Sequence, residues 1–535
     1  MSQRVSDNNV DQLVQGSAWL TGGQTFSRIL GALYIIPWTI LLGQFYLQAN
    51  GLFNKGYTIY ALFLMLSTAG IPSAISDLVA KYFAANQTSA ANKIFNQAIK
   101  LGIGLGIVSA MLLYFGAGFL SIGDKNLPAV LRSLAPAVLI FPVISIIRGY
   151  FQGLHDMKTS AISQVIEQIV RIAYMLISAW IILQANSNDW VKVTIHSTFA
   201  AFVGAIASFL YLGFVFWQRR GQQVIALESN VLLETPPNQM IIQIIRKAMP
   251  FILIGSAITI FQLIDQYTYP FIERMVGTSA EEIDLSFARF NANANKLVMI
   301  IVPFATAIAS SALPILAELK SINNQNQIKE QLINIFRLFS LVMLPASFGM
   351  YAVAKPLYSV FYGVSDPGQA QGVALLQVSS IMAIMFGLFM ILTTSLQALE
   401  HTKVAFRAFV VAVVIKIILQ IPLVAAFHAF GDLWATIIAF TVANFILLYF
   451  VELRYQAGFS SFTNQLKNIL IVSTTVLIAS SIAVYFLNVF VPFSRFGQTI
   501  ALFGATGVGL LVGVFLVKRY RLGSILGGRF GRFLE

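Results

Sequence analysis

The chain has 535 residues, of which 57% are hydrophobic and 10% charged, with a formal net charge of +13 at pH 7. This composition excludes an ordinary soluble domain, in which about 25% of residues are charged. Cysteine is absent, which excludes disulfides, thiolate nucleophiles and cysteine metal sites. Because the cations alternate with long apolar runs, the positive charge indicates a lipid partner and no nucleic acid.

Apolar runs of about 20 residues, each long enough to cross the hydrocarbon core as a helix, recur along the chain. Residues 1–16 are polar and lack a cleavable apolar segment, which predicts that the first run stays as an anchor. The pattern predicts an all-α integral membrane protein with about 14 transmembrane helices. Their ranges are 18–43, 57–76, 99–121, 129–147, 161–184, 194–217, 248–269, 290–316, 332–354, 374–397, 405–427, 433–451, 467–490 and 498–517.

Most Lys and Arg residues outside these runs fall on the side of the N-terminus when successive loops alternate. The positive-inside rule then places both termini in the cytoplasm, in agreement with an even number of helices. We expect an N-terminal lobe over 1–217, a cytoplasmic linker over 218–247, a C-terminal lobe over 248–455, and two extra helices with a basic tail over 456–535.

A weak internal repeat links the two lobes. Residues 151–158 and 396–403 share Gln, Leu and Lys in register, and the same offset aligns Arg171 with Lys416. An even number of predicted helices separates the two segments, so the repeats run parallel. We therefore expect two parallel six-helix lobes around a central cavity, plus two C-terminal helices.

Four cations, Arg28, Arg171, Lys296 and Lys416, lie inside predicted helices. A Lys or Arg at a helix centre costs roughly 2.5 to 3.5 kcal/mol on insertion scales, so such residues face a cavity, a partner charge or a ligand. Three of them, and the predicted helix 248–269, which contains none of the four, have polar residues at helical spacing on one face. These polar residues are Gln24 and Ser27; Gln164, Glu167 and Gln168; Gln262, Asp265 and Gln266; and Asn291, Asn293 and Asn295.

Each buried charge has a structural and a functional interpretation. Glu167 and Arg171 are spaced to neutralise each other on one helix, or they line the cavity. Lys416 pairs with an acid on another helix or serves a ligand. Arg28 has no acid within one turn, which favours a ligand or gating role. Asp265 and Glu167, as intramembrane acids, are the candidates for gating or ion coupling.

Motifs for catalysis are absent. The chain has no Walker A sequence and no His-Glu-x-x-His, and its four histidines fall at or near the ends of predicted helices. We therefore expect a transporter and not an enzyme, with no cofactor and no metal. A membrane glycosyltransferase would need acidic metal or sugar-nucleotide motifs that this sequence lacks.

Three segments resemble a known family: GIPSAISDLVAKY at 70–82, RGYFQGLHDM at 148–157 and SQVIEQIVR at 163–171. They are similar to Gram-positive polysaccharide-export proteins of the YtgP and stage V sporulation protein B branch of the multidrug/oligosaccharidyl-lipid/polysaccharide (MOP) superfamily. The YtgP members of that branch are MurJ-type flippases of lipid II, the undecaprenyl-pyrophosphate-linked peptidoglycan precursor.

The resemblance implies that cavity cations hold the substrate's diphosphate. Arg28 matches such a position, Lys296 is a looser match, and Lys81 stands where the family usually has Arg. With Arg171, Gln24 and Ser27 they form the expected substrate-binding set. The resemblance also implies a bacterial cytoplasmic membrane, an undecaprenyl-diphosphate-linked glycan as partner, and coupling to the membrane potential or a monovalent ion.

These observations predict a lipid II flippase that works by alternating access. Two alternatives within transport remain open at this point. One is a flippase or exporter of another lipid-linked oligosaccharide, such as a teichoic acid or exopolysaccharide repeat unit. The other is a cation-coupled drug exporter of the MATE type, which would favour acids over cations in its cavity.

Overall fold

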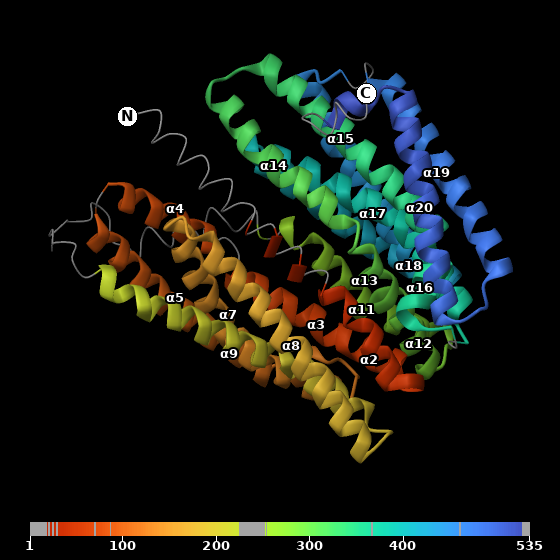
Figure 1. The fold of residues 1–535 in the computed structure, drawn as a ribbon, viewed down its shortest axis with the longest axis horizontal. Helices are drawn as coiled ribbons and strands as arrows, with labels where there is room; N and C mark the ends of the chain where they lie inside the picture. Colours follow the sequence, from red (N-terminus) through yellow and green to blue (C-terminus); the bar gives the residue numbers. More distant parts are fainter. Residues whose placement is uncertain are drawn as a thin grey trace. The chain divides into compact units, whose positions relative to one another are not determined.

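The computed structural model describes residues 19, 22–23, 26–27, 30–68, 71–85, 87–223, 252, 254–364, 367–458 and 462–526. Every element of regular secondary structure in these ranges is helical (Figure 1). Among the described residues, 11 helical stretches are long and apolar enough to cross a membrane. The prediction of an all-α membrane protein is therefore confirmed.

The chain forms two compact units, Met1–Ile252 and Leu253–Glu535. Residues 224–251, which include most of the expected linker, lie outside the described residues, as do the polar residues 1–16 and the basic tail from 527 onward. The four-part division of the chain stays a prediction.

The N-terminal unit is built around α7. This helix contacts α3, α4, α5, α8 and α9, and apolar residues on all its sides are buried, as a helix without a polar face requires. Its neighbours lie alongside it in Figure 1. The elements are α2 (Ile35–Leu42), η1 (Gly43–Phe45), α3 (Tyr46–Thr68), α4 (Ile71–Ala84), α5 (Thr88–Phe115), α6 (Ala117–Leu120), α7 (Leu127–Gly153), α8 (Met157–Ala185) and α9 (Trp190–Gln223).

The C-terminal unit packs around α17, which contacts α14, α15, α16 and α18, while α19 and α20 lie side by side against α15 (Figure 1). The predicted helix 290–316 begins in the π-helix η2 and is interrupted by a turn at 299–301, between α13 and α14. The elements are α11 (Ala257–Val276), α12 (Ala280–Phe287), η2 (Ala288–Ala294), α13 (Asn295–Val298), α14 (Val302–Ser321), α15 (Gln325–Ala352), α16 (Ala354–Tyr362), α17 (Gln369–Ala398), α18 (Thr402–Tyr455), α19 (Thr463–Phe490), α20 (Arg495–Arg519) and η4 (Gly523–Leu526).

The long element α18 consists of two helices that meet at His428. This residue has φ 52° and ψ −131°, outside the helical region. Gly431 then packs so closely on the backbone of Leu423 that a Cβ atom would overlap the Leu423 carbonyl oxygen. Residues eight positions apart touch in this way only when the chain folds back on itself, since a continuous helix would hold them about 12 Å apart. The halves of α18 therefore form a tight hairpin.

The two segments aligned by the internal repeat contain the same helix-ending turn, which also follows α14 at Asn323 and α20 at Arg521. The turn between α7 and α8 contains His155 with φ 60°, and the turn between α17 and α18 contains Glu400, the aligned residue, with φ 65°. Both turns carry the same three hydrogen bonds from backbone N–H groups to carbonyl oxygens. They are Leu154 to Tyr150, His155 to Gln152 and Asp156 to Phe151 in the first turn, and Leu399 to Ser395, Glu400 to Gln397 and His401 to Leu396 in the second.

Candidate functional site

Two members of the expected substrate-binding set, Gln24 and Arg28, lie outside the described residues. Ser27 is described, and its Oγ is buried without a hydrogen-bond partner in the part of the chain that the structure covers. A buried hydroxyl without a partner costs free energy, so this position suits a polar ligand.

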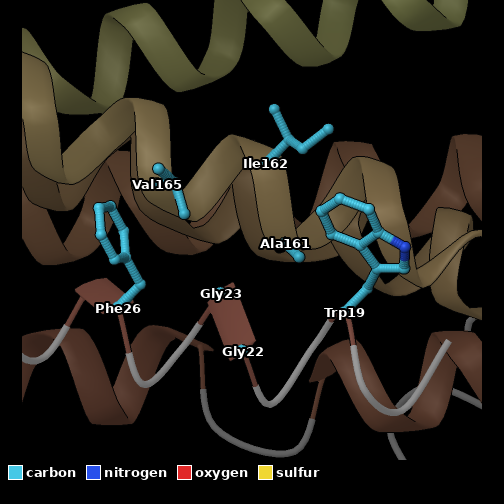
Figure 2. A pocket seen from close by; sticks show the side chains of 7 residues that line it. All are labelled: Trp19, Gly22, Gly23, Phe26, Ala161, Ile162 and Val165. Atoms are coloured by element: carbon cyan, nitrogen blue, oxygen red, sulfur yellow. The ribbon is translucent and has the colours of Figure 1, made fainter. Parts of the chain in front are cut away.

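An apolar hollow of about 550 Å³ lies between Trp19, Gly22, Gly23 and Phe26 on one side and α8 on the other (Figure 2). Trp19 and Phe26 line it from one side and Ile162 and Val165 from the other. Gly23 allows the close approach, because a Cβ atom there would lie 2.9 Å from the Cβ of Ala161. The hollow is part of the packing of the N-terminal unit.

Arg171 on α8 contacts an aromatic side chain of α3. Its guanidinium donates a hydrogen bond to the Tyr57 hydroxyl, and its Cζ lies 4.9 Å from the centroid of the Tyr57 ring. The ring is itself stacked on Phe53, with centroids 4.9 Å apart. This is a cation–π contact on a rigid platform. Among the described residues, no carboxylate forms an ion pair with Arg171.

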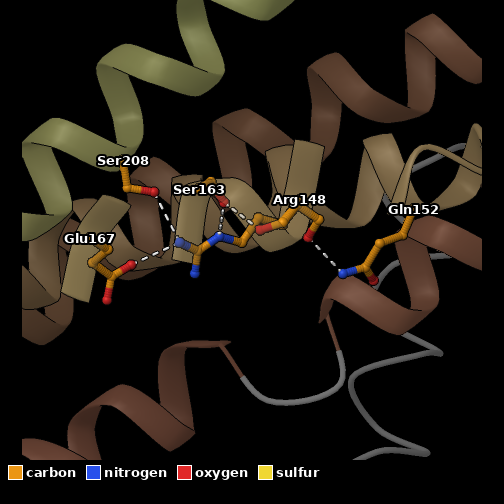
Figure 3. Close-up of polar contacts among 6 residues, drawn as sticks. Arg148, Gln152, Ser163, Glu167 and Ser208 are labelled. Atoms are coloured by element: carbon orange, nitrogen blue, oxygen red, sulfur yellow. Dashed lines mark hydrogen bonds and ion pairs between the residues drawn. The ribbon is translucent and has the colours of Figure 1, made fainter. Parts of the chain in front are cut away.

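Glu167 pairs with Arg148 on α7, not with Arg171 (Figure 3). The Arg148 guanidinium lies 2.8 Å from Glu167 Oε2 and donates to Ser163 Oγ at 2.8 Å and to Ser208 Oγ at 2.9 Å. The expected ion pair within α8 is therefore wrong. Glu167 and Arg171 are spaced for contact, but Arg148 offers Glu167 a partly buried partner that is also held by two hydroxyls.

Lys81 and Lys296 occupy different surroundings. Lys81 is exposed in the last turn of α4. Lys296 is half-buried in the short helix α13, directly after the π-helix η2. π-Helices are rare and frequently occur at functional sites. The expected substrate contact Lys296 therefore follows a kind of element that often marks such sites.

The C-terminal unit contains a cluster of three buried, ionisable side chains. The Nζ of Lys416 lies 2.7 Å from Asp265 Oδ1 on α11 and 3.4 Å from Asp432 Oδ2 in the second half of α18. It also donates to the backbone carbonyl of Asp432 at 2.9 Å. Gln420 Nε2 donates to Asp432 Oδ1. Lys416, Gln420 and Asp432 are completely buried, and Asp265 is nearly so.

Sequence reasoning missed Asp432. The predicted helix begins at residue 433, which assigned Asp432 to a polar turn, whereas the hairpin places it beside Lys416 and Gln420. The available signal was its position directly after Gly431, the residue that permits the close approach of the two half-helices.

A hydrogen bond between side chains also joins α11 to the turn of this hairpin. His428 Nδ1 lies 3.1 Å from both carboxylate oxygens of Glu273, a buried residue near the end of α11. Thr278 donates to the same carboxylate at 2.6 Å. The cluster and this pair fix α11 to α18 at two levels.

Comparison with known proteins gives the family. The model of a family described as polysaccharide biosynthesis protein matches residues 13–320. The chain belongs to the polysaccharide biosynthesis protein family. The lipid II flippase MurJ of Bacillus subtilis is 30% identical over 98% of both chains, and the stage V sporulation protein B of the same organism is 28% identical over 37% of this chain and 38% of its own.

Solved structures show the fold shared by this family. A lipid II flippase MurJ in an inward closed conformation superposes with a TM-score of 0.65 and 14% identity, over 94% of this chain and 99% of the other. An outward-facing MATE family transporter of the MOP superfamily gives 0.59 and 14%, over 83% and 96%. The relatives are transporters, so the expectation of a transporter rather than an enzyme is confirmed, as is membership of the MOP superfamily.

Proposed function

We propose that the chain is a flippase of lipid II that moves this undecaprenyl-diphosphate-linked peptidoglycan precursor across the bacterial cytoplasmic membrane. The observation that carries the proposal is the 30% identity to the lipid II flippase of Bacillus subtilis over 98% of both chains. The proposed topology has 14 transmembrane helices with both termini in the cytoplasm, and transport is by alternating access driven by the membrane potential or a monovalent ion.

The cations of the N-terminal unit suit a diphosphate. Glu167 pairs with Arg148, and among the described residues no carboxylate forms an ion pair with Arg171. Tyr57 holds its guanidinium by ring and hydroxyl. A diphosphate that leaves water needs charge-assisted hydrogen bonds in return, and Arg supplies them in a fork that matches phosphate oxygens. We assign Arg171 and Arg28 to this role, with Gln24 and Ser27 as polar neighbours and Lys81 and Lys296 as further cations.

The acids Glu167 and Asp265 were predicted to serve in gating or ion coupling. The pairing of Glu167 with Arg148 supports a positioning role, in which it holds α7 against α8 near Arg171. Asp265, within a cluster that contains two carboxylates and one ammonium, remains the proposed coupling residue.

Another lipid-linked glycan is the second candidate. A protein of Haloferax volcanii described as a probable low-salt glycan biosynthesis flippase is 28% identical over 29% of this chain. The same cations would bind any glycan carried on a polyprenyl diphosphate or phosphate, because they contact the phosphate and not the sugar.

Complementation of a bacterial strain depleted of its lipid II flippase separates the candidates. We expect the wild-type gene to restore growth and Arg28→Ala to abolish it at normal membrane abundance, with Arg28→Lys partly active because the charge survives without the fork. Lys192→Ala, which removes an exposed cation, is the matched control. Failure of the wild-type protein to restore growth, together with transport of another polyprenyl-linked glycan in proteoliposomes, would replace lipid II by that glycan.

A further inference from the structure

The cluster of Asp265, Lys416 and Asp432 contains one more carboxylate than ammonium. All three side chains are buried, and the two carboxylates reach the same ammonium, at 2.7 and 3.4 Å. With both acids ionised, the cluster would carry one uncompensated negative charge in a dry interior. Such a charge is expensive, and groups so placed take up a proton instead.

Within the part of the chain that the structure describes, the neighbouring helices supply no second cation to the cluster. Asp432 and Lys416 are the charged groups that act on the Asp265 carboxyl, and α17, which packs on α18, has no ionisable side chain. On α11, Tyr269 donates to Ser286 at 3.0 Å and Glu273 is held by His428 and Thr278. The other charged groups on these helices lie elsewhere. Arg337 of α15 donates to Asn334, and Lys329 of the same helix is partly exposed. The rest are exposed: Arg274 of α11, Glu281, Glu282 and Asp284 of α12, Glu330 of α15, and Lys403, Arg407, Glu452 and Arg454 of α18.

Three buried oxygens of the cluster also lack a hydrogen-bond donor other than the Lys416 ammonium. Asp265 Oδ1 and Asp432 Oδ2, the two oxygens nearest the ammonium, are buried and accept no hydrogen bond in the described structure apart from their ion pairs with Lys416. Gln420 Oε1 is buried without a donor as well. Buried acceptors are almost always satisfied. One added hydrogen on a carboxylate would supply a donor to one of these acceptors and would also remove the excess charge.

We propose that the C-terminal unit contains a proton-binding site in which Asp265 and Asp432 share one proton against the ammonium of Lys416. The protonated cluster is neutral. Release of the proton leaves one buried negative charge, so release requires water to reach the cluster, and water reaches it only if α11 separates from the α18 hairpin. Protonation is thereby coupled to the packing of these helices.

A proton suits this site better than a metal ion. The ammonium already lies within reach of both carboxylates and of the Asp432 carbonyl oxygen, which is the place a small cation would take. Among the described residues, no group of three or more His, Asp or Glu side chains could hold a metal. The inference concerns the C-terminal unit alone and rests on the proposed function for the assignment of Asp265 to ion coupling, but it does not depend on which lipid is moved.

Infrared spectroscopy of the purified full-length protein tests the proposal directly. At neutral pH we expect the carbonyl stretch of a protonated carboxyl group in a dry environment, shifted by exchange into D₂O. Asp265→Asn and Asp432→Asn should each remove it, because one carboxylate then pairs with one ammonium, while Asp77→Asn, at an exposed acid of α4, should keep it. Lys416→Met should strengthen the band, since both acids then need a proton.

Three results would overturn the proposal. The first is the absence of this band from the wild-type protein at neutral pH, which needs no variant and so does not depend on how well the variants fold. The second is a band that survives in both Asn variants, which would assign it to another carboxyl group. The third is loss of the band when Na⁺ is added at constant pH, which would make a metal cation the occupant.

Discussion

Arg148 on α7 holds the carboxylate of Glu167 on α8 at 2.8 Å, although Arg171 lies one turn from Glu167 on the same helix. Both partners are largely buried, with side chains 13% and 14% exposed. The guanidinium also bonds two hydroxyls, Ser163 on α8 and Ser208 on α9. Arg148 therefore links three helices, and Arg171 contacts Tyr57.

This arrangement predicts a selective coupling between mutations. Arg148→Gln and Glu167→Gln should each lower the melting temperature of the purified protein, because each leaves a largely buried charge without its partner. The double variant should recover part of the loss, with an interaction energy of about 0.5–3 kcal/mol. The matched cycle of Glu167→Gln with Arg171→Gln should show little coupling. Strong coupling in the second cycle and none in the first would restore the ion pair within α8.

A second prediction separates the two roles given to Tyr57 and Arg171. Tyr57→Phe keeps the ring but removes the hydroxyl that accepts from Arg171. It should cost about 1.5–3 kcal/mol of stability, as expected for a hydrogen bond to a charged group, and should leave transport largely intact. Arg171→Ala should abolish transport of fluorescent lipid II in proteoliposomes, and Arg171→Lys should retain part of it. Transport at the wild-type rate by Arg171→Ala would remove this residue from the substrate site.

The sequence predicted the helical segments better than it predicted which charged side chains pair. Hydrophobic run length located most of the helices, but residues 46–56, which fall between the predicted helices 18–43 and 57–76, belong to α3. The internal repeat stays a prediction, because the turn shared by His155 and Glu400 also occurs at Asn323 and Arg521. Lys416 was expected to find either an acid on another helix or a ligand, and Asp265 is such an acid.

The sequence could not predict which charged side chains pair between helices, because the pairing depends on where helices end and on how they pack. Arg148 was assigned to a cytoplasmic loop, but α7 continues to Gly153, so Arg148 lies within this helix. Asp432 was assigned to a turn, but the hairpin at His428 is so tight that it lies against Lys416. An error of a few residues in a helix boundary therefore changed which charges could meet.

Topology is testable because the chain contains no cysteine. Single cysteines at Ser229, in the expected linker, and at Ser494, which caps the first turn of α20, should react from opposite sides of the membrane. An impermeant maleimide applied to intact cells should modify Ser494→Cys only, because the positive-inside rule places the linker in the cytoplasm. Modification of both positions from outside would contradict the proposed orientation.

The last prediction concerns Gly431, which brings Asp432 to Lys416. Its Cα lies against the backbone of Leu423, so the methyl group of Gly431→Ala would overlap the Leu423 carbonyl oxygen. Backbone on both sides cannot yield as a flexible side chain would, so we expect a loss of at least about 1–3 kcal/mol. Gly507→Ala in α20 is the matched control: no atom lies within 4 Å of its new Cβ, and replacing a helical glycine should gain about 1 kcal/mol. The melting temperatures of the two purified variants test the expected loss and the expected gain of stability.

Because the hairpin holds Asp432, the Gly431→Ala protein that does fold should also lose the infrared band of the shared proton, whereas Gly507→Ala should keep it. A Gly431→Ala protein with wild-type stability and an unchanged band would show that the close approach of the two half-helices does not position the cluster.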